Sequence, residues 1–320
     1  MKALITGGAG FVGSHLAEVL LADGHRVHVV DDLSTGSIDN IVPFKAHREF
    51  HYEIGAVTDV PLMTDLVDEA DVIFHLAAVV GVKLAVERPV ETLETNLNGT
   101  GVLLKLAGRK KKRVLIASTS EVYGDGPDQP LREDAPVLLY PTVKSRWSYA
   151  WSKAIDESLA MAHWTQRGLP VIVARLFNTV GPRQTGRYGM VIPRLVHQAL
   201  AGEPLTIYGD GAQSRCFAYV GDVARGLADL ALCPEAAGQI FNVGNDQEVT
   251  INDLARRIIR ATGSSSPVTH LPYGQVYGEG FEDMRRRVPD LTKIRRAVGY
   301  RTTKDLDDII RMVADHARRG

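Results

Sequence analysis

A run of closely spaced glycines near the N-terminus constrains the fold of this chain more than any other feature. Gly7, Gly10 and Gly13 follow a short apolar run, Ala3–Thr6, and open a helical pattern. Residues without side chains permit a tight turn and let backbone N–H groups approach a pyrophosphate at the positive end of a helix. Asp31 closes the next apolar run 18 residues after Gly13, near the position where such domains place a ribose-binding carboxylate. The pattern predicts a dinucleotide-binding domain.

The second carboxylate beside Asp31 bears on which dinucleotide would bind. Asp32 follows directly, and no arginine comes immediately after the pair. A carboxylate at this position accepts hydrogen bonds from the adenosine ribose hydroxyls and repels a 2′-phosphate. We therefore expect NAD rather than NADP as the cofactor.

Short apolar runs alternate with amphipathic stretches over the first 175 residues. Runs without polar alternation, separated by helices, indicate a parallel sheet covered on both faces. The expected strands are Ala3–Thr6, Arg26–Val30, Val72–Leu76, Val114–Ser118 and Val171–Arg175, and the expected helices include Ser14–Ala22, Pro89–Leu106, Tyr149–Gln166, Pro193–Ala201 and Ile251–Ala261. We predict an α/β fold: a Rossmann-type doubly wound parallel sheet with a smaller C-terminal substrate-binding lobe.

The domain boundary is expected near residue 175, where glycine and proline become frequent. Residues 1–175 would form the cofactor domain and residues 176–320 the substrate lobe. The two would be interleaved, because apolar runs at Phe217–Val220 and Ile240–Val243 are expected to return to the large sheet.

Composition narrows the class of protein further. The chain has 37 Lys and Arg residues against 38 Asp and Glu, a net charge of −1, so electrostatics favour neither a nucleic-acid nor a membrane partner. No apolar run approaches the roughly 18 residues that span a bilayer. Cys216 and Cys233 are the only cysteines, which argues against a disulfide framework. We expect a soluble cytoplasmic protein without a metal site.

Tyr149 and Lys153 are spaced to lie on one face of a helix. A free tyrosine has a pKa of about 10 and is a poor base at neutral pH. A neighbouring ammonium stabilises the phenolate, so the pair can act in proton transfer. A strand end that carries hydroxyls, Ser118-Thr-Ser-Glu-Val-Tyr-Gly124, precedes the pair.

These motifs together resemble the extended short-chain dehydrogenases/reductases of the NAD-dependent nucleotide-sugar epimerase/dehydratase type. The resemblance runs over nearly the whole chain. It includes the glycine loop, the Tyr/Lys pair, Phe74-His-Leu-Ala-Ala78, Asn96-Leu-Asn-Gly-Thr100, Arg175-Leu-Phe-Asn178, Gly181-Pro-Arg183 and Leu205-Thr-Ile-Tyr-Gly-Asp-Gly211. The family usually forms homodimers through a four-helix bundle, which the helices after Asn96 and after Tyr149 would supply, with Trp147, Trp151 and Trp164 as candidate apolar anchors.

The resemblance also implies site residues. The cofactor would contact the glycine loop and residues further along the chain. The expected contacts are Gly7, Gly10, Phe11, Val12, Gly13, Asp31, Asp32, Val57, Leu76, Ala77, Ala78, Asn96, Tyr149 and Lys153. Thr119 would bind the sugar C4 hydroxyl. The nucleotide sugar would contact Lys83, Ser120, Asn178, Val191, Arg194, Tyr208, Arg215 and Arg287. One departure concerns adenine, because Ala56 stands where family members usually carry an aspartate, so only the Val57 backbone is expected to contact the base.

The resemblance leaves the reaction open among three chemistries. All begin with oxidation at C4 of the sugar. A 4,6-dehydratase usually offers an Asp–Glu pair where this chain has Ser120 and Glu121, whereas a 4-epimerase needs no base beyond the tyrosine, and Gly81-Val-Lys83 with Asn96-Leu-Asn98 resembles that class. Thr-Ser-Glu-Val-Tyr-Gly, Ser145-Arg-Trp-Ser-Tyr149 and Arg287-Val-Pro-Asp290 resemble UDP-glucuronate decarboxylases. We favour a decarboxylase in which Thr119, Glu121, Tyr149 and Lys153 are catalytic; a UDP-sugar 4-epimerase is the alternative, and a 4,6-dehydratase is less favoured.

Overall fold

Seven parallel strands form the central sheet of the computed structural model, which describes residues 1–126, 129–138, 140–186, 190–277 and 283–319. The strand order is β11-β6-β5-β4-β1-β2-β3. The chain starts in the middle of the sheet and winds outward in both directions, so the order reverses at β1 and β4. The strand bounds are β1 Lys2–Thr6, β2 Arg26–Asp31, β3 Phe50–Ile54, β4 Val72–His75, β5 Arg113–Thr119, β6 Val171–Leu176 and β11 Gln239–Val243.

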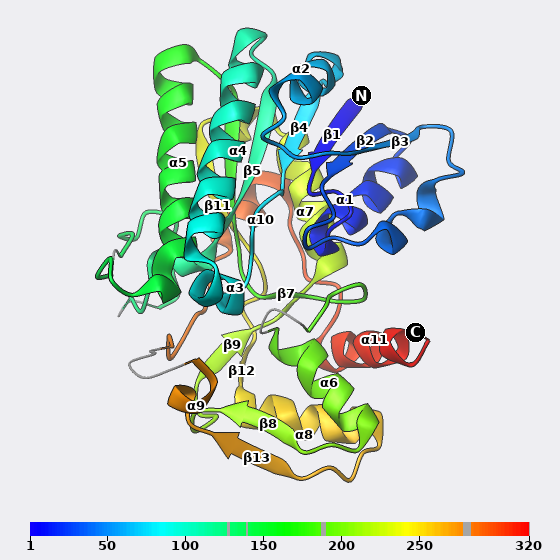
Figure 1. Ribbon diagram of the computed structural model, residues 1–320, viewed down its shortest axis with the longest axis vertical. Coiled ribbons are helices and arrows are strands. Elements are labelled where there is room, and N and C mark those ends of the chain that lie inside the picture. The colour runs from blue at the N-terminus through cyan, green and yellow to red at the C-terminus, as the bar shows by residue number, and fades with distance from the viewer. Residues whose placement is uncertain (127–128, 139, 187–189, 278–282, 320) are drawn as a thin grey trace.

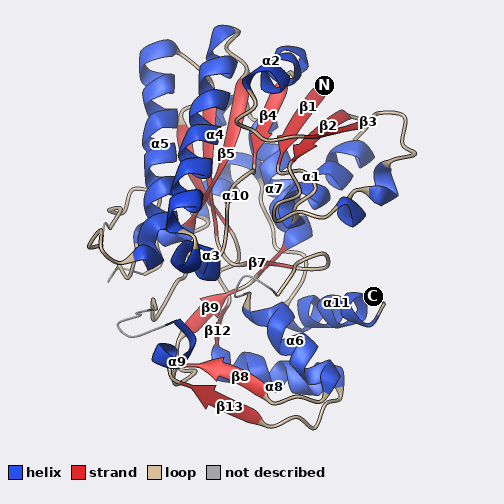
Figure 2. Cartoon of the chain, viewed as in Figure 1, coloured by secondary structure: helices blue, strands red, loops and turns tan. Residues whose placement is uncertain are grey.

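Helices cover both faces of this sheet and make a three-layer sandwich (Figure 1, Figure 2). Alternation along β1 shows the arrangement, since Ile5 packs in the cluster that holds α1 and α7, and Leu4 packs in the cluster that holds α2 and α4. The helices of this part are α1 Phe11–Ala22, α2 Val60–Glu69, α3 Val82–Glu87, α4 Pro89–Arg109, α5 Ser148–Arg167, α7 Val220–Leu232 and α10 Thr292–Val298. The doubly wound fold expected from the apolar runs is confirmed.

A smaller lobe packs below the carboxyl ends of the strands (Figure 1). It has its own core, in which Leu195, Leu254 and Ile310 bring three helices together. Its elements are α6 Val191–Ala201, β8 Leu205–Tyr208, β9 Ser214–Cys216, β12 Glu248–Thr250, α8 Ile251–Thr262, β13 Val268–Leu271, α9 Tyr273–Tyr277 and α11 Leu306–Arg318. β8 pairs with β13, and β9 pairs with β12.

Two segments differ from the expectation. Phe217–Val220 does not return to the large sheet: β10, Ala218–Tyr219, pairs with β7, Thr179–Val180, in a separate two-stranded ribbon. Ile240–Val243 does return, within β11 beside β6. The edge strand β3 was not expected, because its side chains beyond Phe50 are exposed and its sequence therefore carries no apolar run.

Within the described residues, no helix is long and apolar enough to cross a membrane. Both cysteines, Cys216 and Cys233, are free thiols.

A buried ion pair fastens α5 to the sheet. Arg175 on β6 donates from Nε and Nη2 to the two carboxylate oxygens of Glu157, at 2.9 and 2.7 Å. Ser118 on β5 donates to the same carboxylate at 2.5 Å. Both charged side chains are almost fully buried, and the bidentate geometry is the strongest form of such a contact. The pair therefore sets the position of α5 relative to β5 and β6.

Replacing Glu157 by alanine should destabilise the fold by about 3–5 kcal/mol, because it leaves the Arg175 guanidinium buried without its counter-charge. Urea unfolding followed by circular dichroism measures this. Asp315→Ala is the matched control, since it breaks an exposed pair with Arg318 and should cost at most about 1 kcal/mol. Equal losses in the two variants would contradict the assigned role of the buried pair.

Candidate active site

The glycine loop after β1 makes a side-chain-free cradle at the start of α1. Gly7 has a φ of 70°, and a Cβ there would lie 2.7 Å from the Ala77 backbone nitrogen. A Cβ on Gly13 would collide with the Gly7 carbonyl. Gly10 caps α1 without any side chain, so the first amides of the helix face the cavity above them. Exposed N–H groups at a helix N-terminus favour a phosphate group.

Asp31 lies at the carboxyl end of β2 and is only 8% exposed. Its two oxygens accept from the backbone amides of Ala9 and Leu33 at 2.9 and 2.8 Å. Burial raises the pKa of this carboxyl, and the two amides oppose the rise. The contacts orient the carboxylate, and each oxygen keeps a lone pair for a further donor. Asp32 is exposed and accepts from the amide and hydroxyl of Ser34, so it shapes the turn that follows.

A cavity of about 300 Å³ runs over this cradle. Its walls include all the expected cofactor residues of the loop and strand ends: Gly7, Gly10, Phe11, Val12, Gly13, Asp31, Asp32, Val57, Leu76, Ala77 and Ala78. The cradle that a Cβ would fill, the open helix start and the oriented Asp31 carboxylate fit a dinucleotide with an unphosphorylated ribose. We conclude that the residues present suit NAD.

Asn96 takes a different place from the one expected. It is buried in α4, and its side-chain amide both accepts and donates a hydrogen bond. The Val79 N–H donates to its Oδ1 at 2.8 Å, and its Nδ2 donates to Ser152 Oγ at 3.0 Å. Asn96 is not among the residues lining either cavity. It holds the loop after β4 against α5 and so supports the cavity wall from behind.

A second cavity, of about 350 Å³, opens between the large domain and the small lobe. It shares Phe11, Val12, Leu76, Ala78 and Val80 with the first cavity, so the two spaces adjoin. It brings together nearly all the expected catalytic and substrate residues: Thr119, Ser120, Glu121, Tyr149, Lys153, Asn178, Val191, Arg194, Tyr208, Arg215 and Arg287. Lys83 lies in α3, but its side chain is outside the described part of the structure.

Tyr149 and Lys153 project from the first turns of α5 toward the end of β5. The Tyr149 hydroxyl hydrogen-bonds with Thr119, and Lys153 lies one helical turn further on, 2% exposed. Burial raises the pKa of Tyr149 well above its ordinary value, and the negative charges of Glu121 and Asp156 raise it further. A cationic group bound in the adjoining cavity would lower this pKa, which makes proton transfer by Tyr149 depend on an occupied cofactor site.

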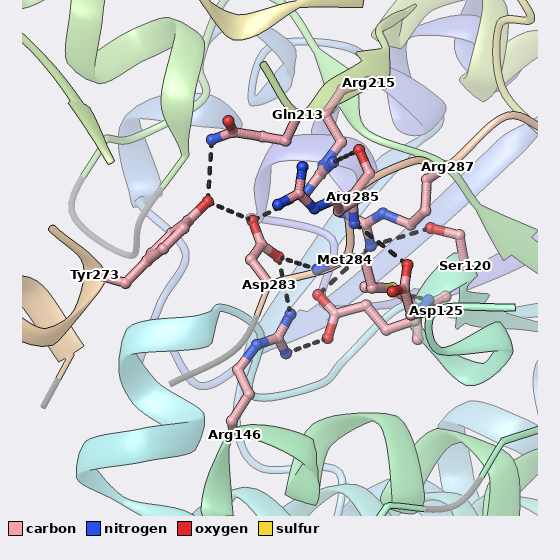
Figure 3. A network of polar contacts seen from close by, with 12 residues as sticks. Ser120, Asp125, Arg146, Gln213, Arg215, Tyr273, Asp283, Met284, Arg285 and Arg287 are labelled. Carbon is pink, nitrogen blue, oxygen red and sulfur yellow. Dashed lines mark hydrogen bonds and ion pairs between the residues drawn. The ribbon is translucent and has the colours of Figure 1, made fainter. Parts of the chain in front are cut away.

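Three arginines and two carboxylates form a cluster in the wall of this cavity (Figure 3). Glu121 accepts from Arg146 at 2.7 Å and lies 3.8 Å from Arg287. Asp283 accepts from Arg215 at 2.8 Å and lies 3.8 Å from Arg146. The arginines outnumber the carboxylates, so the cluster has an excess of positive charge suited to an anionic ligand.

The cluster holds Glu121 in its ionised form. Burial opposes ionisation, but Arg146 and Arg287 bring the pKa of Glu121 below its ordinary value. Burial and the nearby Arg215 lower the pKa of Arg287 to about 10. Arg287 also reaches Ser120 at 3.4 Å and Asn178 at 3.2 Å, while its buried Nε has no partner among the described atoms. Arg287 is therefore poised for a further acceptor.

The residues missed from the sequence are Arg146, Asp283 and Tyr273. Arg146 stands in the quoted segment before Tyr149, and an arginine amid aromatic residues beside a catalytic pair was the available signal. Asp283 and Tyr273 stand in no motif. Tyr273 donates to Asp283 at 3.4 Å and accepts from Gln213 at 3.0 Å, contacts that only the folded small lobe creates.

Comparison with known proteins shows which proteins this chain resembles. The family model described as GDP-mannose 4,6 dehydratase matches residues 4–313. A UDP-N-acetyl-α-D-glucosaminuronate decarboxylase from Bacillus cytotoxicus is 43% identical, covering 92% of this chain and 90% of the relative. UDP-glucuronic acid decarboxylase 1 from Xenopus tropicalis is 37% identical, covering 99% of this chain and 72% of the relative. A UDP-glucuronic acid 4-epimerase from Bacillus cereus, solved with UDP-glucuronic acid and NAD, has a TM-score of 0.90 at 28% identity and covers 100% and 99%.

The fold and the site define an NAD-dependent enzyme of the extended short-chain dehydrogenase/reductase class, which modifies nucleotide sugars. Within that class, the chain belongs to the family whose model is described as GDP-mannose 4,6 dehydratase, and its relatives include UDP-uronate decarboxylases.

Asp31→Ala should weaken NAD binding by about 10- to 100-fold, because a charge-assisted contact to the ribose is worth about 1.5–3 kcal/mol. NADP binding should weaken less, since the variant also loses a negative charge that repels the 2′-phosphate. Calorimetric titration of both dinucleotides measures the ratio. Asp32→Ala is the control, because its carboxylate accepts from Ser34 and stands exposed. An unchanged NAD-to-NADP ratio in the Asp31 variant would place the ribose elsewhere.

Proposed function

We propose that this enzyme decarboxylates UDP-glucuronate and gives UDP-xylose or its 4-keto form. The observation that carries the proposal is the ionised Glu121 between Arg146 and Arg287, beside the Tyr149–Thr119 pair. A uronate has a carboxylate at C6, and the excess positive charge of this cluster supplies its counter-charge. The similarity to UDP-uronate decarboxylases over most of the chain supports the same reaction.

Tyr149 would begin the reaction by taking the proton of the C4 hydroxyl, with Thr119 holding the same oxygen and Lys153 supplying positive charge nearby. NAD, bound in the adjoining cavity, supplies the hydride acceptor and later the hydride donor at C4. The sugar is then a β-keto acid, whose C5–C6 bond breaks readily because the electron pair is delocalised onto the C4 oxygen. Tyr149, now protonated, can donate a hydrogen bond to that oxygen.

Glu121 and Ser120 would deliver the proton that replaces carbon dioxide at C5. A uronate carboxylate brought close to Glu121 raises the pKa of Glu121, which lets this residue share or donate a proton at the site where carbon dioxide leaves. Arg287, in contact with Ser120, would hold the departing carboxylate. A 4-epimerase of neutral sugars does not require such a carboxylate-binding group, whereas a 4-epimerase of UDP-glucuronate does.

The small lobe would hold the UDP group. Arg194 lies over the ring of Tyr208, 4.1 Å from its centre, and Arg215 reaches toward the same space from β9. Asn178 and Val191 stand at the mouth between the lobe and the sheet. In this proposal residues 1–175 bind NAD and residues 176–320 bind the nucleotide sugar, with β11 returning to the large sheet.

Two alternatives each have a specific observation in their favour. The relative at 43% identity is named for the 2-acetamido form of the uronate, so that sugar is the second candidate substrate. The structure at TM-score 0.90 is a UDP-glucuronic acid 4-epimerase, which would keep the carboxylate and invert C4. A 4,6-dehydratase remains the least supported reaction.

Incubation with UDP-glucuronate and, separately, with its 2-acetamido analogue tests the proposal. If UDP-xylose forms, mass spectrometry should show a product lighter by one carbon dioxide from UDP-glucuronate, with no net NADH. If the 4-keto form is released, the product should be lighter by two further hydrogen atoms, with one NADH formed per product. Glu121→Gln should slow formation of the C5-protonated product by the ~10²–10⁴-fold typical of proton-transfer groups and slow C4 oxidation less. A product of unchanged mass with inverted C4 would establish the epimerase instead, and turnover of the analogue alone would change the substrate.

We also propose a cytoplasmic homodimer built through a four-helix bundle of α4 and α5. The two helices pack along each other, and apolar Val90, Ile155 and Trp164 are exposed on them. Trp147 does not serve as an anchor, because it is buried and stacks on Tyr140 with ring centres 3.9 Å apart.

Ile155→Glu should therefore convert a dimer into monomers, because a charge on this face costs several times RT when it is buried. Light scattering gives the molar mass. Val268→Glu, which changes an exposed apolar residue of the small lobe, is the control and should leave the mass unchanged. A wild-type chain of monomer mass would contradict the proposed dimer.

A further inference from the structure

A buried carboxylate beside the catalytic lysine has no part in the reaction described so far. Asp156 lies on α5, fully buried, and its Oδ2 accepts from the Lys153 ammonium at 3.3 Å. Its neighbour on the helix, Glu157, is occupied by Arg175 and Ser118 on the sheet side. Asp156 is thus the carboxylate in direct contact with Lys153, whose positive charge would stabilise the ionised form of Tyr149.

Asp156 is the end of a chain of buried hydrogen bonds that starts at the cofactor cavity. The Ala77 amide donates to Thr6 Oγ1 at 3.3 Å, and Thr6 lies 2.8 Å from His75 Nδ1. His75 Nε2 lies 3.1 Å from Thr100 Oγ1, and the Thr100 hydroxyl contacts the Asp156 carboxylate. Ala77 lines the cofactor cavity, so the chain joins that wall to Lys153.

The donors in this chain can be arranged in one way. Burial raises the pKa of Asp156, while the Lys153 charge and the Thr100 hydroxyl oppose the rise. In its ionised form the carboxylate only accepts, so Thr100 donates its single proton to Asp156. Thr100 then accepts from His75 Nε2–H, which leaves Nδ1 to accept from the Thr6 hydroxyl. His75 is held neutral, because burial and the charge of Lys153 lower its pKa to about 3. Thr6, His75 and Thr100 therefore each have a partner, and the Lys153 ammonium holds Oδ2 of Asp156 at 3.3 Å. The other carboxylate oxygen, Oδ1, is buried and has no hydrogen-bond partner among the described atoms.

We propose that Asp156 is a positioning residue that holds the Lys153 ammonium in place and offsets part of its charge, so that Tyr149 can both take and return the C4 proton. The inference rests on the proposed function, in which one tyrosine serves oxidation and the later reduction. A lysine acting alone would keep Tyr149 ionised to lower pH and weaken it as a proton donor. The charge of Asp156 acts in the opposite direction, raising the pKa of Tyr149.

The groups that face Tyr149 and Lys153 from the surrounding elements are few. Glu121 faces Tyr149 from the segment after β5, and its charge is held by Arg146. His75 faces Lys153 from β4 and is neutral. Glu157, which also acts on Asp156, is paired with Arg175. Among these groups, Asp156 is the one charge that contacts Lys153 directly.

Asp156→Asn tests the proposal, because it keeps the shape and removes the charge. The ionisation of Tyr149 is followed as phenolate ultraviolet absorbance in the NAD-bound enzyme, with Tyr149→Phe as the blank, and this readout needs no substrate. We expect the titration, and the acid limb of the pH profile for C4 oxidation, to move to lower pH by about one unit. Asp315→Asn, an exposed carboxylate on α11, should leave both unchanged.

Two variants at Thr100 test the same proposal in case the Asp156→Asn variant does not fold. Thr100→Val removes the hydroxyl that orients Asp156, and Thr100→Ser keeps it. The valine variant should shift the titration in the same direction by a smaller amount, and the serine variant should restore the wild-type curve. An unshifted phenolate titration in Asp156→Asn and in Thr100→Val would overturn the inference. If the wild-type enzyme releases no carbon dioxide from either uronate, the proposed function fails, while the phenolate titration still decides the role of Asp156.

Discussion

The buried contact between Glu157 and Arg175 organises the catalytic half of the molecule. It fixes α5 to β5 and β6 at one place, and α5 supplies Tyr149 and Lys153. The same guanidinium lies over the ring of Tyr123, 4.6 Å from its centre. The Tyr123 hydroxyl donates to Asn242 on β11. One ion pair thus sets the register between the catalytic helix, the strand end that bears Thr119, and the edge of the sheet.

The same framework reaches Arg287 through the backbone. Asn242 donates to the carbonyl oxygens of Leu131 and Asp290, and the Leu131 amide donates to Val288. Arg287 immediately precedes Val288, so its position beside Ser120 depends on contacts that begin at the sheet. Arg287 and Glu121 come from segments more than 160 residues apart in the chain, yet the sheet edge holds them within one charged cluster.

Local patterns in the sequence were enough to predict the sheet, the cofactor loop and the Tyr/Lys pair. Glycines at Gly7 and Gly13, and the spacing of Tyr149 and Lys153, have a meaning that depends only on nearby chain. β3 was not predicted, because an edge strand with exposed side chains needs no apolar run. Asp283 and Arg146 were not predicted as site residues, because their contact forms only when two segments far apart in the chain come together. Asn96 lies behind the cavity lining; a motif identifies a residue near the cofactor without saying whether it faces the ligand or supports the wall.

The wall common to the two cavities has a consequence for ligand design. Both spaces are bordered by Phe11, Val12, Leu76, Ala78 and Val80, together with Gln184 and Met190. The nicotinamide end of a dinucleotide in one cavity and the sugar of a nucleotide sugar in the other would therefore meet at this largely apolar junction. A bisubstrate molecule could therefore occupy both cavities if a short uncharged linker joined its two halves. Such a ligand would gain from two anchoring groups at the entropic cost of immobilising one molecule, and the linker length that gives the highest affinity would report the distance between the two binding positions.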